Sequence, residues 1–438
     1  MELVSLQSIM EYIPELILCG TAVLLILLDI FNVKAILVYV AIAGIILHLF
    51  FLHDIFKMIM GAAAIITLCI SDRQQKVEYF FLILCILFGA DILVSTSSFV
   101  MILLGMEMIS LSSYVLTTGM HPAKERAEAG WKFFIYGSVA TAIMVFGMTY
   151  LYGSNGRAYL SAISPLDKAA MLGGVMTLCG FLFKMTAAPF HLWAPDVYEA
   201  TPAPVVAYLS VVPKLAAFLL VAQWTAALDV HHEIVIIVAA IFSIVTGTLA
   251  ALNQKNAKRM MAYSSVAQAG FFLAILPTLS DANVMVFYAL VFAIMNYAVF
   301  MVIHFQEQSG KGTAFGDFSG IGRRNPLVAI AITLGLVSLT GLPPTAGFMA
   351  KLAVFTGIWR TYADAEQPIF LVLFVVGLLA TVASLFFYLK IPFYAFFRPS
   401  EEKQPIKINL LSNLLLIILV ALLLALFVAP GLVDGLHE

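Results

Sequence analysis

The sequence predicts an all-α polytopic membrane protein, and three observations support that fold class. Apolar residues make up 62% of the 438 residues and charged residues only 11%, against about 45–50% and about 25% in soluble domains. The mean hydropathy is +1.02. Apolar runs long enough for a helix to cross a bilayer core of about 30 Å follow one another along the chain. The formal net charge of −2 gives no indication of nucleic acid as a partner.

Fourteen apolar runs can be marked as predicted transmembrane spans. They cover residues 12–31, 34–52, 56–71, 78–96, 98–118, 130–152, 168–197, 203–226, 234–252, 259–279, 284–306, 326–361, 368–390 and 410–430. The connections between them are short, and none is long enough for a soluble domain.

Basic residues test this count, because Lys and Arg favour cytoplasmic loops. With the N-terminus outside, sixteen fall in inner loops: Lys34, Arg73, Lys76, Lys124, Arg126, Lys132, Lys255, Lys258, Arg259, Lys311, Arg323, Arg324, Lys390, Arg398, Lys403 and Lys407. Only four fall in outer loops: Lys57, Arg157, Lys168 and Arg360. The remaining three of the 23, Lys184, Lys214 and Lys351, lie inside predicted spans. The sequence therefore predicts both termini on the outer side.

Four ionisable residues are expected near the middle of the membrane: Glu107 and the three lysines within spans. A charge at that depth costs about 2.5–3.5 kcal/mol on insertion scales, so such a residue usually faces a cavity or a partner. Any one of them alone could be a structural ion-pair partner. Four at one depth favour an ion pathway.

Two spans are expected to be discontinuous. The seventh contains Pro189, and the twelfth contains Pro343 and Pro344 before Lys351. Proline removes a backbone donor and clashes with the preceding helical turn. Unwound backbone at membrane depth occurs only against protein or a water-filled cavity, and broken helices with ionisable groups are typical of transporters.

The position of the breaks also indicates an inverted repeat. Residues 78–226 and 234–390 each contain five predicted spans, and the broken helix is the fourth in each set. An odd number of crossings gives the two sets opposite orientations. Residues 1–77 form an N-terminal three-helix segment, and residues 391–438 form a loop and a final helix.

Other polar residues in the apolar runs are expected to have ordinary roles. Glu15, Asp29 and Asp91 lie toward span ends, where a carboxylate can reach lipid headgroups, and His48 and His304 are expected to be core or interface residues. The cysteines lie in apolar runs without metal-ligand spacing, so no metal or iron–sulfur site is expected.

The four mid-membrane residues suit proton transfer. Desolvation lowers the pKa of a lysine and a nearby carboxylate raises it, so a lysine that gains and loses such a partner can load and release a proton. We expect Glu107 to modulate Lys184, Lys184 to exchange protons with Lys214, and Lys351 to serve the other half of the path. Polar residues that could order water between them are Ser112, Tyr136, Thr186, His191, Ser264 and Gln268. No P-loop or dinucleotide fingerprint is present, so the energy must come from partners or a gradient.

Four motifs resemble a known family. The stretch KMTAAPFHLWAPDVYEATPAPVVAYLSVVPK closely resembles the signature of the antiporter-like N subunit of respiratory complex I, the proton-translocating NADH:quinone oxidoreductase. LLGMEMISLSSYVL, NQKNAKRMMAYSSVAQAGF and TGLPPTAGFMAKLAVF fit the same family in the same order. The resemblance covers roughly residues 78–390. It places the family's fifth-span glutamate on Glu107 and its lysines on Lys184, Lys214 and Lys351.

The resemblance implies a fourteen-helix subunit of a proton-pumping translocase with no redox centre of its own. NAD, FMN, iron–sulfur clusters and quinone are expected in partner subunits. The expected partners are neighbouring antiporter-like and small membrane subunits together with membrane lipids, and the expected location is the bacterial inner membrane.

Two features keep alternatives open. Gln268 stands where relatives often carry a histidine, which leaves its titration in question. Subunits of Mrp-type cation/proton antiporters, and of related hydrogenases or ferredoxin-driven complexes, share the glutamate, the lysines and the G-x-P-P motif. The placement of Pro213 directly before Lys214 resembles the N subunit more than the related L and M subunits. A third alternative is a scaffold that only seals and anchors a larger complex.

Overall fold

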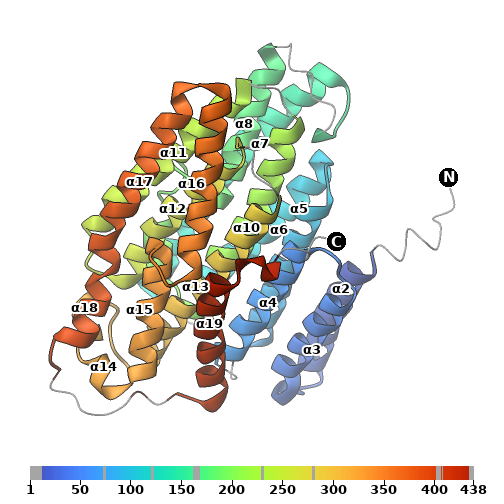
Figure 1. Ribbon diagram of the computed structural model, residues 1–438. Coiled ribbons are helices and arrows are strands. Elements are labelled where there is room, and N and C mark those ends of the chain that lie inside the picture. Colours follow the sequence, from blue (N-terminus) through green and yellow to red (C-terminus); the bar gives the residue numbers. More distant parts are fainter. Residues whose placement is uncertain are drawn as a thin grey trace.

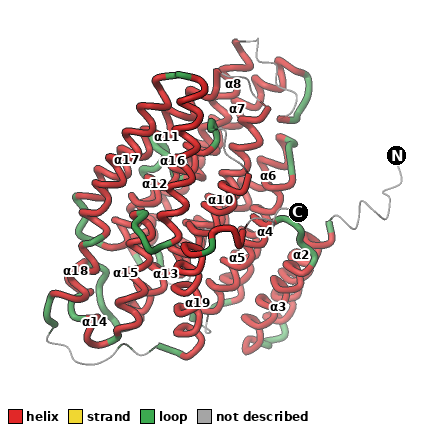
Figure 2. The backbone as a smooth tube through the Cα atoms, viewed as in Figure 1, coloured by secondary structure: helices red, strands yellow, loops and turns green. Residues whose placement is uncertain are grey.

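The computed structural model describes residues 12–72, 75–119, 123–160, 168–227, 231–278, 282–400, 406 and 408–433. Within these ranges the regular structure is helical, and the connections are short loops (Figure 2). Three of the basic residues used for the topology, Arg73, Lys403 and Lys407, lie outside the described residues.

The described residues of the first part of the chain form nine α-helices. They are α2 (Ile13–Ile30), α3 (Leu37–Phe50), α4 (Ile55–Ile70), α5 (Val77–Ser95), α6 (Phe99–Thr118), α7 (Lys124–Asn155), α8 (Lys168–Met185), α9 (Ala194–Ala200) and α10 (Ala203–Ala227). The rest of the chain continues with α11 (His231–Leu252), α12 (Ala257–Ile275), α13 (Ala282–Gln308), α14 (Ile321–Arg324), α15 (Pro326–Thr340), α16 (Ala346–Ala365), α17 (Pro368–Tyr388), α18 (Lys390–Phe397) and α19 (Leu410–Val428).

Ten candidate spans among the described residues are long and apolar enough to cross a membrane. A helix satisfies its backbone hydrogen bonds internally, which is required where no water is available. The coarse expectation of an all-helical polytopic membrane protein is therefore confirmed.

Helix ends follow the local chemistry of the sequence. The side chains of Asp54, Asn256 and Asn409 accept backbone N–H groups in the first turns of α4, α12 and α19. These caps satisfy donors that have no partner within the helix. Proline opens α15 and α17, where its missing N–H costs nothing.

The long helices run side by side, with α2 and α3 at one edge of the bundle and α17 at the opposite edge (Figure 1). The centre is formed by α10 and α13, in whose spanning stretches 89% and 94% of the residues are buried. By contrast, those of α2 and α19 are only 22% and 28% buried, as expected for helices that face lipid or a partner. Pro213 lies inside α10 without ending it.

Both expected helix breaks are present, and their geometry matches. At the first break, α8 ends at Met185, Thr186 has a φ of 62°, and the N–H of Ala187 donates to the Leu182 carbonyl. At the second, α15 ends at Thr340, Gly341 has a φ of 87°, and the N–H of Leu342 donates to the Val337 carbonyl. A helix C-terminus is closed in this way when one residue has a left-handed backbone and the N–H of the next residue donates to the carbonyl five residues back. The prolines lie just beyond these turns.

Two expectations about the N-terminal helices are wrong. Lys57 is not an outer-loop residue: it lies in α4, 7% exposed, with its Nζ 2.7 Å from Glu15 Oε1. Asp91 does not reach headgroups, since its side chain is fully buried beside His48. The error arose because distance from a helix end was used in place of packing, and α2, α3 and α4 cover these positions.

Candidate proton-transfer site

Helix α12 connects the buried polar groups of the two halves of the protein. It lies between α10 and α16, and almost all of its side chains are buried. Ser264, Ser265 and Gln268 are three of its polar side chains, each at most 2% exposed. Since α12 is buried along its length, these groups can be satisfied only by protein or internal water.

Lys214 makes direct contact with α12. Its side chain is fully buried, and its Nζ donates to the Ser265 carbonyl oxygen at 2.6 Å and to Ser265 Oγ at 2.5 Å. The ring of Phe292 lies beneath the ammonium at 5.3 Å. Ser265 Oγ is also 3.2 Å from the Tyr198 hydroxyl of α9. Lys214 is therefore joined through Ser265 to the helix that follows the first break.

Gln268 joins two tyrosines to the second break. The Tyr288 hydroxyl donates to its Oε1 at 2.5 Å, and its Nε2 donates to the Leu339 carbonyl at 3.2 Å. The Tyr388 hydroxyl interacts with Gln268 and with Ser264 Oγ. Gln268 and Ser264 therefore belong to one buried polar network, as expected for relay positions.

Lys351 lies directly after the second break. Its Nζ donates to the Thr340 carbonyl at 2.8 Å, and the Phe271 ring of α12 lies 4.8 Å from the ammonium. Thr340 is the last residue of α15, whose final carbonyls have no helical partner. The break therefore supplies the acceptor that holds Lys351, one residue from the carbonyl that holds Gln268.

Lys184 has a different environment. Among the described residues no hydrogen-bond acceptor reaches its Nζ, and the rings of Tyr114, Phe133 and Phe183 lie 5.6–5.9 Å away. The carboxylate that interacts with it electrostatically is Glu107 of α6. Glu107 is half-buried and accepts a hydrogen bond from Thr141 at 2.8 Å. Glu107 therefore acts on Lys184 through space and without a direct ion pair, and aromatic rings surround the ammonium in place of polar partners.

The remaining relay candidates are spread more widely. His191 and Thr186 are buried in the first break, and His191 Nδ1 has no hydrogen-bond partner among the described residues. Ser112 interacts with the Cys85 thiol of α5. Tyr136 is 44% exposed on α7. Only His191 and Thr186 lie on a broken segment that also carries a lysine.

Sequence reasoning missed the two serines that satisfy the breaks. Ser243 Oγ of α11 accepts the N–H of Ala188 at 2.9 Å, and Ser338 Oγ of α15 accepts the N–H of Gly347 at 3.1 Å. Both serines are fully buried. Ser243 lies far from Ala188 in sequence, so no local pattern could have identified it.

Ion pairs hold the short helix α9 at one face of the bundle. Asp196 pairs with Lys132 of α7 at 2.8 Å and with Arg259 of α12 at 2.9 Å, and Arg259 also pairs with Glu199 at 2.7 Å. At the same face Lys258, 3% exposed, pairs with Glu307 at 2.8 Å and donates to the Thr201 carbonyl. The segment between the first break and α10 is thereby fixed against α12. Among the described residues, no three His, Cys, Asp or Glu side chains gather as metal ligands.

The chain is similar to characterised proteins over most of its length. The family model described as "NADH:quinone oxidoreductase/Mrp antiporter, TM" matches residues 96–381. NADH-quinone oxidoreductase subunit N 2 of Chloroherpeton thalassium is 33% identical over 92% of this chain and 88% of the relative. A chain of respiratory complex I from Thermus thermophilus is 28% identical with a TM-score of 0.85, covering 97% of this chain and 99% of that one.

A more distant structure shares only the fold. A chain of the Mrp complex from Dietzia is 19% identical with a TM-score of 0.80, over 97% of this chain and 95% of the other. The family model, the identity to subunit N and the coverage of both chains agree. The chain therefore belongs to the NADH-quinone oxidoreductase subunit N family, within the larger NADH:quinone oxidoreductase/Mrp antiporter family.

Proposed function

We propose that this chain is a proton-translocating membrane subunit of NADH:quinone oxidoreductase, which couples quinone reduction to proton transfer through a Glu/Lys relay. The observation that carries the proposal is that α12 takes part in two groups of buried polar contacts. One joins Lys214 to Ser265, and the other joins Gln268 to the break that holds Lys351. Burying an ammonium group costs free energy unless the group is paired. Several buried lysines in one chain therefore indicate a functional role.

Glu107 is the control element of this relay. Lys184 lacks a hydrogen-bond acceptor among the described residues, while Lys214 and Lys351 each donate to a backbone carbonyl. The free energy of a charge on Lys184 therefore depends strongly on Glu107. Loss of the Glu107 charge, or its movement away from Lys184, would drive the Lys184 proton toward Lys214, where Ser265 and Tyr198 supply hydroxyl groups.

The second half of the relay uses Gln268 and Lys351. An amide orders water without titrating, so the proton would pass Gln268 by way of Ser264, Tyr288, Tyr388 and water toward Lys351. His191 and Thr186 would border the water in the first break, with Ser112 and Tyr136 at the margins.

The proposed layout is fourteen spans with inverted five-helix repeats at 78–226 and 234–390, after the N-terminal segment 1–77 and before the C-terminal part 391–438. The matched breaks support it: each has a left-handed residue, a bond five residues back and a buried serine that accepts a backbone N–H. The layout puts both termini on the outer side of the bacterial inner membrane.

The redox chemistry is assigned to other subunits. NAD, FMN, iron–sulfur clusters and quinone would be bound there, and this chain would contact neighbouring antiporter-like and small membrane subunits as well as lipids, but not nucleic acid. The relatives and structural neighbours are parts of multisubunit complexes, which supports this division.

The experiment is proton pumping by the assembled complex in inverted membrane vesicles. We expect Lys184→Ala and Glu107→Ala to lower both NADH-driven proton uptake and quinone-linked turnover, while the complex assembles. Full pumping by assembled Lys184→Ala would overturn the relay and leave a scaffold. Cation-dependent proton transport by the isolated chain would instead support the Mrp-type alternative.

A further inference from the structure

The N-terminal helices contain a second group of buried ionisable side chains, away from the lysine series. His48 Nε2 of α3 lies 3.1 Å from Asp91 Oδ2 of α5, and Lys57 Nζ of α4 lies 2.7 Å from Glu15 Oε1 of α2. Asp91 also interacts electrostatically with Lys57 and Glu15. We call Glu15, His48, Lys57 and Asp91 the N-terminal tetrad. Each residue comes from a different helix and lies near the same end of the four-helix group, as the alternating helix directions require.

Burial in the tetrad is close to complete. The side chains of His48 and Asp91 are fully buried, and those of Lys57 and Glu15 are 9% and 14% exposed. His48 Nδ1 is fixed by the Pro14 carbonyl at 3.0 Å, which directs Nε2 toward Asp91. Apart from that imidazole, no donor among the described residues reaches either Asp91 oxygen. A buried carboxylate with unused acceptor capacity is costly, and a proton bound there would remove that cost.

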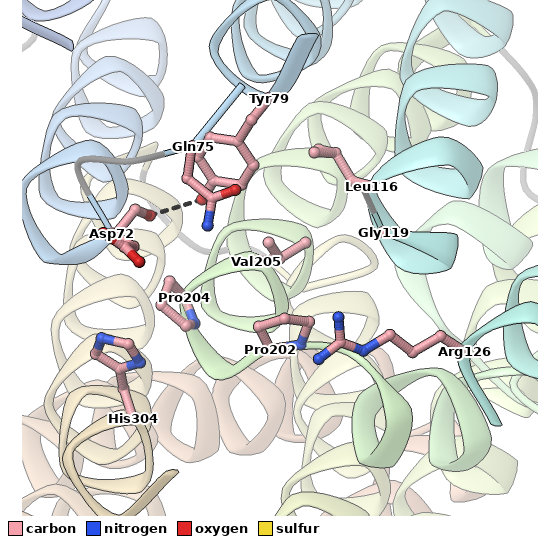
Figure 3. A pocket seen from close by; sticks show the side chains of 11 residues that line it. Asp72, Gln75, Tyr79, Leu116, Gly119, Arg126, Pro202, Pro204, Val205 and His304 are labelled. Carbon is pink, nitrogen blue, oxygen red and sulfur yellow. Dashed lines mark hydrogen bonds between the residues drawn. The ribbon is translucent and has the colours of Figure 1, made fainter. Parts of the chain in front are cut away.

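A pocket lies at the end of α4 and α5 opposite the tetrad, and Figure 3 shows the side chains that line it. Its volume is about 120 Å³, enough for several water molecules. The lining includes Ser71, Asp72 and Tyr79 from the end of α4 to the start of α5, with Arg126 of α7 and His304 of α13. Charged and hydroxyl groups therefore meet water at the end where α4 finishes.

Hydroxyl groups lead from this pocket into the protein along α4. The Tyr79 hydroxyl lies 2.6 Å from Ser71 Oγ, and Ser71 Oγ donates to the Thr67 carbonyl at 2.6 Å. Thr67 Oγ1 lies 2.7 Å from the Tyr297 hydroxyl of α13. These side chains are all buried. The series covers the first third of the distance from Ser71 to Lys57, which is roughly 21 Å at 1.5 Å per residue.

Tyr208 of α10 continues the series toward the tetrad. It is fully buried, its hydroxyl donates to the Ile83 carbonyl at 2.9 Å, and Tyr297 and Asp91 are titratable groups in its neighbourhood. Cys85 and Tyr79 of α5 are further titratable groups near Tyr208. The polar groups thus extend from the pocket to the tetrad through the apolar core of α4, α5, α10 and α13.

We infer that Asp91 and His48 form a proton-binding site, loaded from the Ser71–Asp72 pocket through Thr67, Tyr297 and Tyr208. The ligand is a proton, which binds the Asp91 carboxylate and is shared with His48 Nε2. The Lys57–Glu15 ion pair lies beside the site at the end of the helices away from the pocket, and the proton leaves the site at that end. The inference goes beyond the Glu/Lys relay and uses none of its residues, so failure of one leaves the other untouched.

The test compares isosteric variants in the assembled complex. Protons taken up per NADH oxidised, assembled amount and passive proton permeability are measured in inverted vesicles for Asp91→Asn, Tyr297→Phe and Thr67→Val. We expect the same fractional loss of the proton-to-NADH ratio in all three, at normal assembly and permeability. The matched control is Thr117→Val, because that buried hydroxyl donates only to its own helix, at the Ser113 carbonyl.

Each other outcome overturns the inference. A normal ratio in assembled Asp91→Asn removes the site, and a loss in Asp91→Asn without a loss in Tyr297→Phe removes the route. If Asp91→Asn fails to assemble, Tyr297→Phe decides alone, since it leaves the tetrad intact: a normal ratio there contradicts the proton-binding role and leaves the tetrad a structural cluster.

Discussion

Lys214 and Ser265 form the closest polar contact between α10 and α12 at the centre of this protein. The ammonium touches both the carbonyl oxygen, at 2.6 Å, and the hydroxyl, at 2.5 Å, of the same residue. One serine thereby holds the lysine and is itself in contact with Tyr198. Any proton that leaves Lys214 starts from this arrangement.

Replacing Ser265 with alanine removes one of the two acceptors of Lys214. A hydrogen bond to a charged group is worth about 1.5–3 kcal/mol, so we expect the rate of proton uptake to fall roughly tenfold or more. Lys214→Met should abolish it. Initial rates in vesicles measure both. The control is Ser210→Ala on α10, the helix that carries Lys214, because the Ser210 hydroxyl donates to the Ala207 carbonyl of its own helix. Wild-type rates in Ser265→Ala would show that the hydroxyl plays no part.

Gln268→Leu removes a buried amide with partners on three other helices. It would leave the Tyr288 hydroxyl and the Leu339 carbonyl unsatisfied, at about 1–3 kcal/mol each. We expect a lower thermal midpoint of the complex together with slower pumping. Gln268→His, which places a titratable ring there, should retain pumping. If Gln268→Leu pumps normally, the two halves of the relay are not joined at this position.

The serines at the helix breaks are expected to matter for stability. In Ser243→Ala the buried N–H of Ala188 loses its acceptor, and in Ser338→Ala the N–H of Gly347 does. Each change should cost about 1–3 kcal/mol. Thermal unfolding and the assembled fraction measure the loss. Thr117→Val serves as the comparison, because that buried hydroxyl donates to its own helix at the Ser113 carbonyl; equal effects in all three would refute a special role for the breaks.

Two lysines at the same face should respond differently to removal of charge. Lys258 is 3% exposed and paired with Glu307, so Lys258→Met leaves a partly buried carboxylate without its counter-ion, with the Ala203 N–H still donating to it, at a cost of about 3 kcal/mol. The Lys132 side chain is 41% exposed, and water and salt screen its pair with Asp196. We expect Lys258→Met to reduce assembly sharply, and Lys132→Met to have a small effect that fades at high salt. Immunoblots of membrane fractions and salt-dependent melting test this, and the reverse order would contradict it.

Much of the fold followed from the sequence because the bilayer restricts the choice. Apolar length set the helices, and Pro189 and Pro343 marked the breaks within a few residues, since proline cannot continue a helix. The four mid-membrane residues were found because charge is rare there. Lys57 and Asp91 were misjudged because both lie near helix ends. There, composition alone cannot show whether a charged side chain reaches lipid headgroups or packs against a buried partner.

The sequence by itself determined the membrane class, the order of the helices and both broken segments, because each depends on local composition and spacing. It also singled out Glu107, Lys184, Lys214 and Lys351 as candidates for proton transfer. Only the tertiary structure decided which groups meet. The deciding contacts join different segments of the chain. They are Lys214 with Ser265, Lys351 with the Thr340 carbonyl, the Ala188 N–H with Ser243, and His48 with Asp91. Such contacts are set by the rotation and packing of one helix against another, which no local pattern encodes.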